Sequence, residues 1–145
     1  MTNQIAIESD EIQARRHRFM NLALPVRLGE LAESLAFATV TSDHPKYPKF
    51  LTRTLNESVN LIDWTVAAVD PEVQIELAEL RSHLTDWLRD AQAIGGDPVK
   101  RARVVAALRE WSQKILDRSG LADYDDWQME FDYPPGIRAA AEVLV

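Results

Sequence analysis

Two pairs of polar side chains at helical spacing are the residues of this sequence best suited to chemistry. Glu30 and Glu33 lie three positions apart, and Glu57 and Asn60 repeat that spacing further along the chain. Residues three apart share one face of a helix, so two acids placed in this way can chelate one cation. Carboxylate oxygens suit a hard divalent ion. The spacing of Glu30 and Glu33 therefore makes them candidate ligands for one cation.

The same spacing resembles part of a known enzyme family. In the all-α nucleoside triphosphate pyrophosphohydrolases of the MazG type, Glu-x-x-Glu and Glu-x-x-Asp on adjacent helices hold Mg²⁺ against the phosphates of the substrate. The resemblance covers only residues 29–60, and it implies Glu30, Glu33 and Glu57 as metal ligands. Asn60 stands where the family has Asp, and it lacks the charge that a hard cation favours. This activity, with Mg²⁺ as its cofactor, is therefore an alternative interpretation of the sequence.

The histidines do not add a second catalytic or metal site. None of His17, His44 and His83 lies within four residues of another, so no zinc-type spacing is present. Glu79 and His83 could share one helical face, but that face lies opposite the leucines of the same segment, which predicts a solvated charged stripe. The chain has no cysteine, no recognisable Ser/His/Asp order and no glycine-rich phosphate loop. The leading interpretation is therefore a protein without catalysis and without a cofactor.

The segment Asp123–Tyr133 is the least ordinary part of the sequence, because five acidic and four aromatic residues stand among eleven. Disordered chains are poor in aromatic residues, so we expect this segment to dock, either on its own helices or on another subunit. Tyrosine and tryptophan are enriched at protein interfaces, and acidic groups speed the encounter with a basic partner. The candidate partner-binding residues are Tyr124, Trp127, Phe131 and Tyr133.

The distribution of charge favours self-association. Residues 1–60 carry seven basic and seven acidic side chains, whereas residues 61–145 carry nine basic and sixteen acidic ones. A two-fold axis would let the acidic segment of each subunit meet the basic part of the other, which includes Arg15, Arg16 and Arg18. We therefore expect a homodimer, or a complex with another protein.

The elements that position these residues are predicted to be helices. Apolar residues recur at intervals of three and four over 12–38, 51–69, 73–91 and 104–116, and no hairpin turn signal is present. The fold class is therefore all-α, an antiparallel bundle of four to five long helices with the acidic, aromatic C-terminal segment packed on it. We expect one domain over residues 1–145, with the bundle at about 9–120 and the tail at about 121–145.

The helix ends are predicted from local signals. Ser9 indicates the start of the first helix, and Pro25 indicates a kink or two abutting helices. Two Asp-Pro pairs, at residues 70–71 and 97–98, each predict a capped helix start, whereas Gly95-Gly96 and Gly120 predict helix ends. Two tryptophans on the leucine stripes, Trp87 and Trp111, are expected in the core.

Composition excludes several classes of function. The net charge of −7 and the lack of a basic stripe argue against nucleic-acid binding. No apolar run is long enough for a membrane span, and the absence of cysteine and of a signal peptide predicts a cytoplasmic protein. We therefore expect a protein-binding or self-associating helical module. The alternatives are the phosphohydrolase and a bundle that binds an apolar small ligand among Trp64, Trp87 and Trp111.

Overall fold

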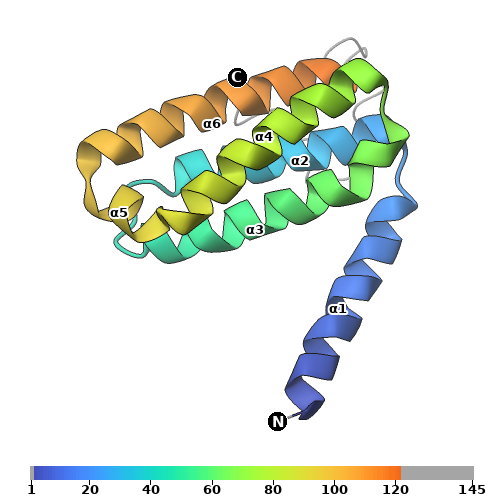
Figure 1. Ribbon diagram of the computed structural model, residues 1–145, viewed down its shortest axis with the longest axis horizontal. Coiled ribbons are helices and arrows are strands. Elements are labelled where there is room, and N and C mark those ends of the chain that lie inside the picture. Colours follow the sequence, from blue (N-terminus) through green and yellow to red (C-terminus); the bar gives the residue numbers. More distant parts are fainter. Residues whose placement is uncertain (1, 122–145) are drawn as a thin grey trace.

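The computed structural model of the protein describes residues 2–121, which form six α-helices and one short 3₁₀ helix (Figure 1). The elements are α1 (Thr2–Met20), α2 (Leu24–Val40), α3 (Tyr47–Thr65), η1 (Val66–Ala68), α4 (Pro71–Arg89), α5 (Ala91–Gly96) and α6 (Pro98–Ser119). This stretch contains no β-strand, so the prediction of an all-helical chain is confirmed. None of these helices is long and apolar enough to cross a membrane.

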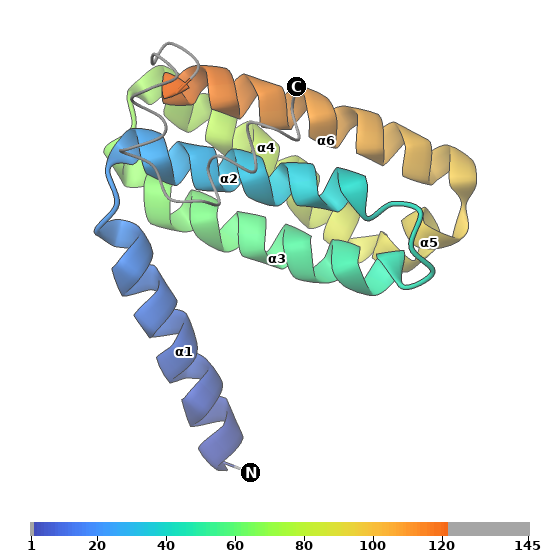
Figure 2. The same cartoon turned by 180° about the vertical axis from the view of Figure 1, so that it is seen from behind.

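Four long helices lie side by side, and α1 stands apart from them. Consecutive long helices from α2 to α6 run in opposite directions, with α5 inserted before α6 (Figure 2). Helix α2 packs mainly against α6 and α3, and α3 packs against α4. Helix α1 leaves this group at the end where α2 begins, and its N-terminus lies far from the other helices (Figure 1). We refer to the group from α2 to α6 as the helical body.

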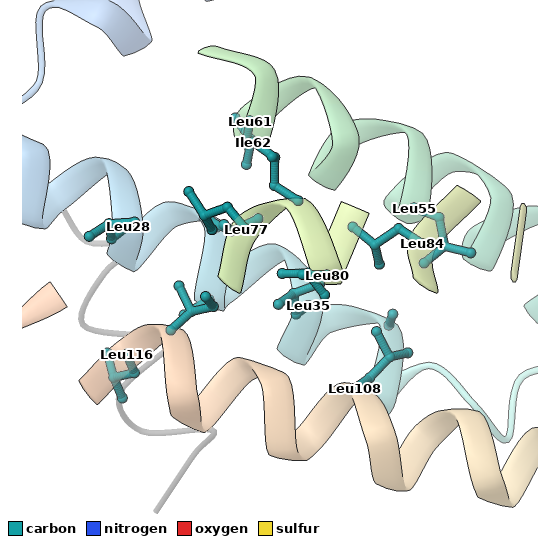
Figure 3. Packing of buried hydrophobic residues seen from close by; sticks show 14 of the residues in the cluster. Leu28, Leu35, Leu55, Leu61, Ile62, Leu77, Leu80, Leu84, Leu108 and Leu116 are labelled. Atoms are coloured by element: carbon teal, nitrogen blue, oxygen red, sulfur yellow. The ribbon is translucent and has the colours of Figure 1, made fainter. Parts of the chain in front are cut away.

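The core of the helical body is built from leucine and other aliphatic side chains. Residues from four helices point toward one another there, with Leu35 from α2, Leu55 from α3, Leu80 from α4 and Leu108 from α6 all fully buried (Figure 3). Burying one such side chain contributes about 1.5–3 kcal/mol. These side chains belong to the stripes that the three- and four-residue spacing predicts, so the apolar periodicity identifies the core correctly.

Three hydrogen bonds, two of them buried, fix α2 against its neighbours. The Ser34 and Ser58 hydroxyls are 2.8 Å apart and join α2 to α3. The Ser112 hydroxyl of α6 donates to the carbonyl oxygen of Ala32 at 2.8 Å. The Tyr47 hydroxyl of α3 donates to the carbonyl oxygen of Ala38 at 2.9 Å, and burial raises the pKa of Tyr47 to about 12. Because short side chains stand at these crossings, the helices approach closely around α2.

The helix ends agree with the sequence signals at three positions. The carboxylate of Asp97 accepts a hydrogen bond from the backbone N–H of Val99 and so caps α6. Gly120 ends that helix in the left-handed conformation with φ of 75°, and the next residue, Leu121, is buried against the core. Helix α4 begins at Pro71 as predicted, but the side chain of Asp70 makes no capping hydrogen bond.

The structure corrects two predicted boundaries and resolves a third. The first helix begins at Thr2 rather than at Ser9, because no glycine or proline interrupts the residues before Ser9. Pro25 separates two helices instead of kinking one, and residues 21–23 form the turn between them. The third predicted helix ends at Arg89, before Gly95, because a break at Asp90 places Ala91 and Ile94 of α5 in the core.

The prediction that Trp87 and Trp111 lie in the core overstates the burial of both side chains. Both are only partly buried, because they lie at the outer edge of the helical body on either side of the exposed His83. The His83 ring is 5.7 Å from the Trp87 ring and 6.0 Å from the Trp111 ring, measured between centroids. These aromatic residues therefore cover the seam between α4 and α6.

Gly95 marks a close contact between α5 and α3, and this contact can be tested. A Cβ atom at residue 95 would lie 2.2 Å from Cγ of the rigid Pro48 ring, whereas a Cβ atom at Gly96 would meet nothing within 4 Å. We expect Gly95→Ala to lower the free energy of unfolding by about 1–3 kcal/mol through overpacking. Gly96→Ala is the matched control and should not lower it. Urea melts of the two variants give the comparison, and equal stabilities would contradict the close contact.

Candidate functional site

The candidate site is a cleft of about 420 Å³ between α2 and α3, which we call the α2–α3 cleft. Its walls combine carboxylates, one guanidinium, two hydroxyls and two large apolar side chains. The lining residues are Glu30, Glu33, Ser34, Phe37, Arg53, Thr54, Glu57 and Leu61. The two helices lie side by side in Figure 2.

A second hollow of about 230 Å³ continues the cleft toward the base of α1. Glu30, Glu57 and Leu61 line both spaces, so the two form one groove. The side chains that α1 and the following turn add to this part are Arg15, Arg18, Phe19 and Leu22, and Trp64 closes it from α3. Phe19 is buried there and lies 5.8 Å from Trp64 between ring centroids.

Helical spacing places these side chains on the cleft. On α2, Glu30, Glu33 and Phe37 stand at i, i+3 and i+7, which is one face of a helix. On α3, Arg53 and Glu57 stand four apart and face the same space. The other faces of α2 are buried against α3 and α6, so this strip is the part of α2 that remains accessible.

The electrostatics of the cleft are dominated by partly buried carboxylates. Burial, together with the nearby charge of Glu30, raises the pKa of Glu33 to about 7. Burial also raises the pKa of Glu30 above its ordinary value. Glu57 forms an ion pair with Arg15 of α1. In the described part of the chain, neither Glu30 nor Glu33 has an ion-pair partner. Two neighbouring carboxylates therefore meet here without a compensating cation in contact.

The structure brings together three of the four side chains that the sequence suggests as metal ligands. Glu30, Glu33 and Glu57 line one cleft, but Asn60 is not among its lining residues. Among the side chains of residues 9–121, no three Asp, Glu or His side chains lie close enough together to hold one metal ion. Glu57, which the resemblance implies as a ligand, is paired with Arg15 in this arrangement.

The tryptophans suggested for an apolar ligand do not surround a common space. Trp64 packs on Phe19 at the base of α1, whereas Trp87 and Trp111 flank His83 on α4 and α6. Glu79 and His83 are both exposed on α4, as expected for a solvated charged stripe.

Sequence reasoning missed the exposure of α1. All residues of α1 from Ser9 to Arg18 are exposed, and Phe19 is its one buried side chain among residues 9–20. The seven-residue spacing of Ile12 and Phe19, together with the three arginines and one histidine at 15–18, is the signal that indicates a distinct surface on this helix. The candidate partner residues Tyr124, Trp127, Phe131 and Tyr133 lie outside the residues that the structure describes.

Comparison with known proteins adds no assignment. No protein-family model, no curated protein and no solved structure matches this chain. The site therefore has to be interpreted from its own geometry.

The raised pKa of Glu33 predicts a pH-dependent stability. In the unfolded chain this carboxyl releases its proton near the ordinary glutamate pKa of 4.5, whereas in the folded chain it keeps the proton up to about pH 7. The stabilising contribution is therefore complete below pH 4.5 and is lost as the pH rises to about 7. Glu33→Gln should flatten this decline in urea melts. Solvent screening limits the effect to about 1 kcal/mol.

The matched control for that measurement is Glu79→Gln. It removes one exposed carboxylate of α4, outside the cleft, and so reports the effect of net charge alone. An NMR titration of the Glu33 carboxyl gives its pKa directly, and a midpoint near 4.5 would show that the cleft does not desolvate this group.

Proposed function

We propose that this protein is a non-enzymatic helical module that binds protein, foremost a second copy of itself, through α1. The observation that carries the proposal is the position of α1 (Figure 1). This helix of 19 residues leaves the helical body, and from Ser9 to Arg18 it buries no side chain. For the whole chain we propose an antiparallel bundle. In this arrangement the acidic, aromatic segment Asp123–Tyr133 is a second contact region.

An unsupported helix of this length has little stability of its own. Nucleating the first turn is unfavourable, and isolated helices shorter than about 12–15 residues are marginal in water even when they are rich in alanine. In proteins, packing of an apolar face normally supplies the missing stability. Since α1 buries only Phe19 among residues 9–20, a partner that covers the rest of the helix supports its folded form.

The face that anchors α1 continues beyond the helical body. Phe19 packs on Trp64, and Ile12 stands seven residues earlier, within about 20° of Phe19 around the helix. Ile12 is 43% exposed and Met20 is 44% exposed. Two large apolar side chains on a projecting helix are a feature of surfaces that associate. In a two-fold dimer, each copy would cover the α1 surface of the other.

The charged residues of α1 orient the partner on this helix. Arg16, His17 and Arg18 are exposed, and no acidic residue of the described chain pairs with either arginine. Surface ion pairs contribute about 1 kcal/mol or less each, so the apolar residues must supply most of the affinity. The acidic segment Asp123–Tyr133 of a second copy has the complementary charge and four aromatic side chains.

Self-association through α1 can be tested with two matched isoleucines. Ile12 of α1 and Ile75 of α4 are both exposed, at 43% and 70%, so a serine at either position leaves the core intact. We expect the full chain to sediment as a dimer, with Ile12→Ser weakening it by about tenfold and Ile75→Ser leaving it unchanged. A chain that ends at Leu121 lacks the acidic segment, so its dissociation constant shows how much that segment contributes to the affinity of the dimer. A full chain that remains monomeric at high micromolar concentration would contradict the proposal.

A second candidate function is hydrolysis of nucleoside triphosphates, and the convergence of Glu30, Glu33 and Glu57 on one cleft favours it. Asn60 and the Arg15–Glu57 ion pair weigh against it.

We expect no measurable hydrolysis of nucleoside triphosphates in Mg²⁺ or Mn²⁺, because Asn60 lacks the charge that a hard cation favours in its ligand set. Assays of pyrophosphate and phosphate release over a panel of nucleotides give the measurement. Turnover that disappears in Glu33→Gln, with an unchanged circular dichroism spectrum, would establish the enzyme instead.

A further inference from the structure

We propose that the α2–α3 cleft of one copy binds helix α1 of a second copy, so that the two copies exchange their first helices. This inference rests on the proposed self-association and assigns the surface that receives α1. It commits to one occupant, the row Ile12, Arg16 and Met20 on the exposed part of α1.

Charge complementarity selects this occupant. The cleft presents Glu30 and Glu33, which have no ion-pair partner among the side chains of residues 9–121, and α1 presents Arg16 without a partner in the same stretch. An arginine can bridge two carboxylates that stand one helical turn apart, because its guanidinium donates in two directions. The cleft is therefore unsuited to the acidic segment Asp123–Tyr133, whose five carboxylates would meet three more.

The apolar side chains match in the same way. Phe37 is 52% exposed and Val40 is 58% exposed, and both continue the α2 face that carries Glu33. With Ile12 and Met20 of α1, they account for four of the six large apolar side chains that are exposed in the described residues. Each of the two surfaces thus combines an uncompensated charge with exposed apolar groups.

The spacing of charge and apolar group is equal on the two helices. Phe37 follows Glu33 by four residues, and Ile12 and Met20 each lie four residues from Arg16, which is about 6 Å along a helix. When Arg16 meets Glu33, Ile12 or Met20 therefore reaches Phe37, depending on the relative direction of the helices. The same chain already shows such a contact, since Arg15 of α1 pairs with Glu57 of the cleft.

The charged groups that face Glu33 come from three helices. They are Glu30 of its own helix, Arg53 and Glu57 of α3, and the Arg15 of α1 that pairs with Glu57. With Glu33 itself, the carboxylates outnumber the guanidinium groups there, so the surface that would receive α1 is acidic.

The test is a charge exchange in the full chain. Arg16→Glu and Glu33→Arg each place like charges together, and we expect each to raise the dissociation constant of the dimer about tenfold in sedimentation experiments. The double variant restores the pair in the opposite sense and should return the constant to within about threefold of the original. Arg16→Glu combined with Glu79→Arg is the matched control, because Glu79 is exposed on α4 outside the cleft. It should give no rescue.

Circular dichroism and thermal melts establish that each variant is folded. If Glu33→Arg does not fold, Glu33→Gln replaces it and should weaken the dimer about threefold. A double variant whose effect is the sum of the two single effects would overturn the proposal.

Single cleft variants that dimerise normally, beside an Ile12→Ser chain that does not, would also overturn it, while self-association through α1 would stand. A monomeric full chain would remove both proposals together. If the chain is monomeric and added Mg²⁺ lowers the pKa of Glu33, the cleft takes a cation and this assignment is wrong.

Discussion

The close packing of α2 against α3 and α6 is the constraint on which the rest of the structure depends. Leu31, Ala32 and Leu35 have no exposed surface, and the polar contacts that fix α2 use short hydroxyls or a buried tyrosine. Because small residues stand at the crossings, neighbouring helices approach closely and cover most of the circumference of α2. The strip that carries Glu30 and Glu33 is what remains accessible. The close packing of the core helices therefore removes part of the hydration of these two carboxylates. A separate set of residues around each carboxylate is not the cause.

This origin explains the electrostatics of the cleft. A carboxylate loses hydration when a neighbouring helix covers one side of it, and a second carboxylate one turn away adds repulsion. Arg15 relieves this only at Glu57. The cleft keeps an excess of negative charge, whereas α1 keeps exposed arginines that find no acid in the described part of the chain. In the proposed dimer both imbalances would be reduced, and a two-fold arrangement would let one contact form twice.

The sequence predicts the fold better than the site. Apolar periodicity identifies the long helices and leucines such as Leu80 and Leu108, because burial alone decides those positions. Helical spacing also singles out Glu30, Glu33 and Glu57, and these three side chains do line one cleft. The exclusion of Asn60 from the lining of the cleft, and the divergence of α1 from the helical body, depend on how whole helices pack. Local signals do not contain that information, since Pro25 predicts an interruption but no direction for the helix before it.

The energetics of α1 connect the fold to the function. A helix that buries one side chain among residues 9–20 gains little from its own core, while ordering its backbone costs roughly 1–2 kcal/mol per residue. Hydrogen bonds within the helix offset much of this cost, but isolated helices remain marginal. A partner that binds only the helical form stabilises it by mass action. The fraction of α1 that is helical should therefore rise with the concentration of its partner, while the helical body, which has its own core, is independent of it. In the proposed dimer, folding of α1 and binding are thus one coupled process, which would act through the exposed Ile12 and Arg16.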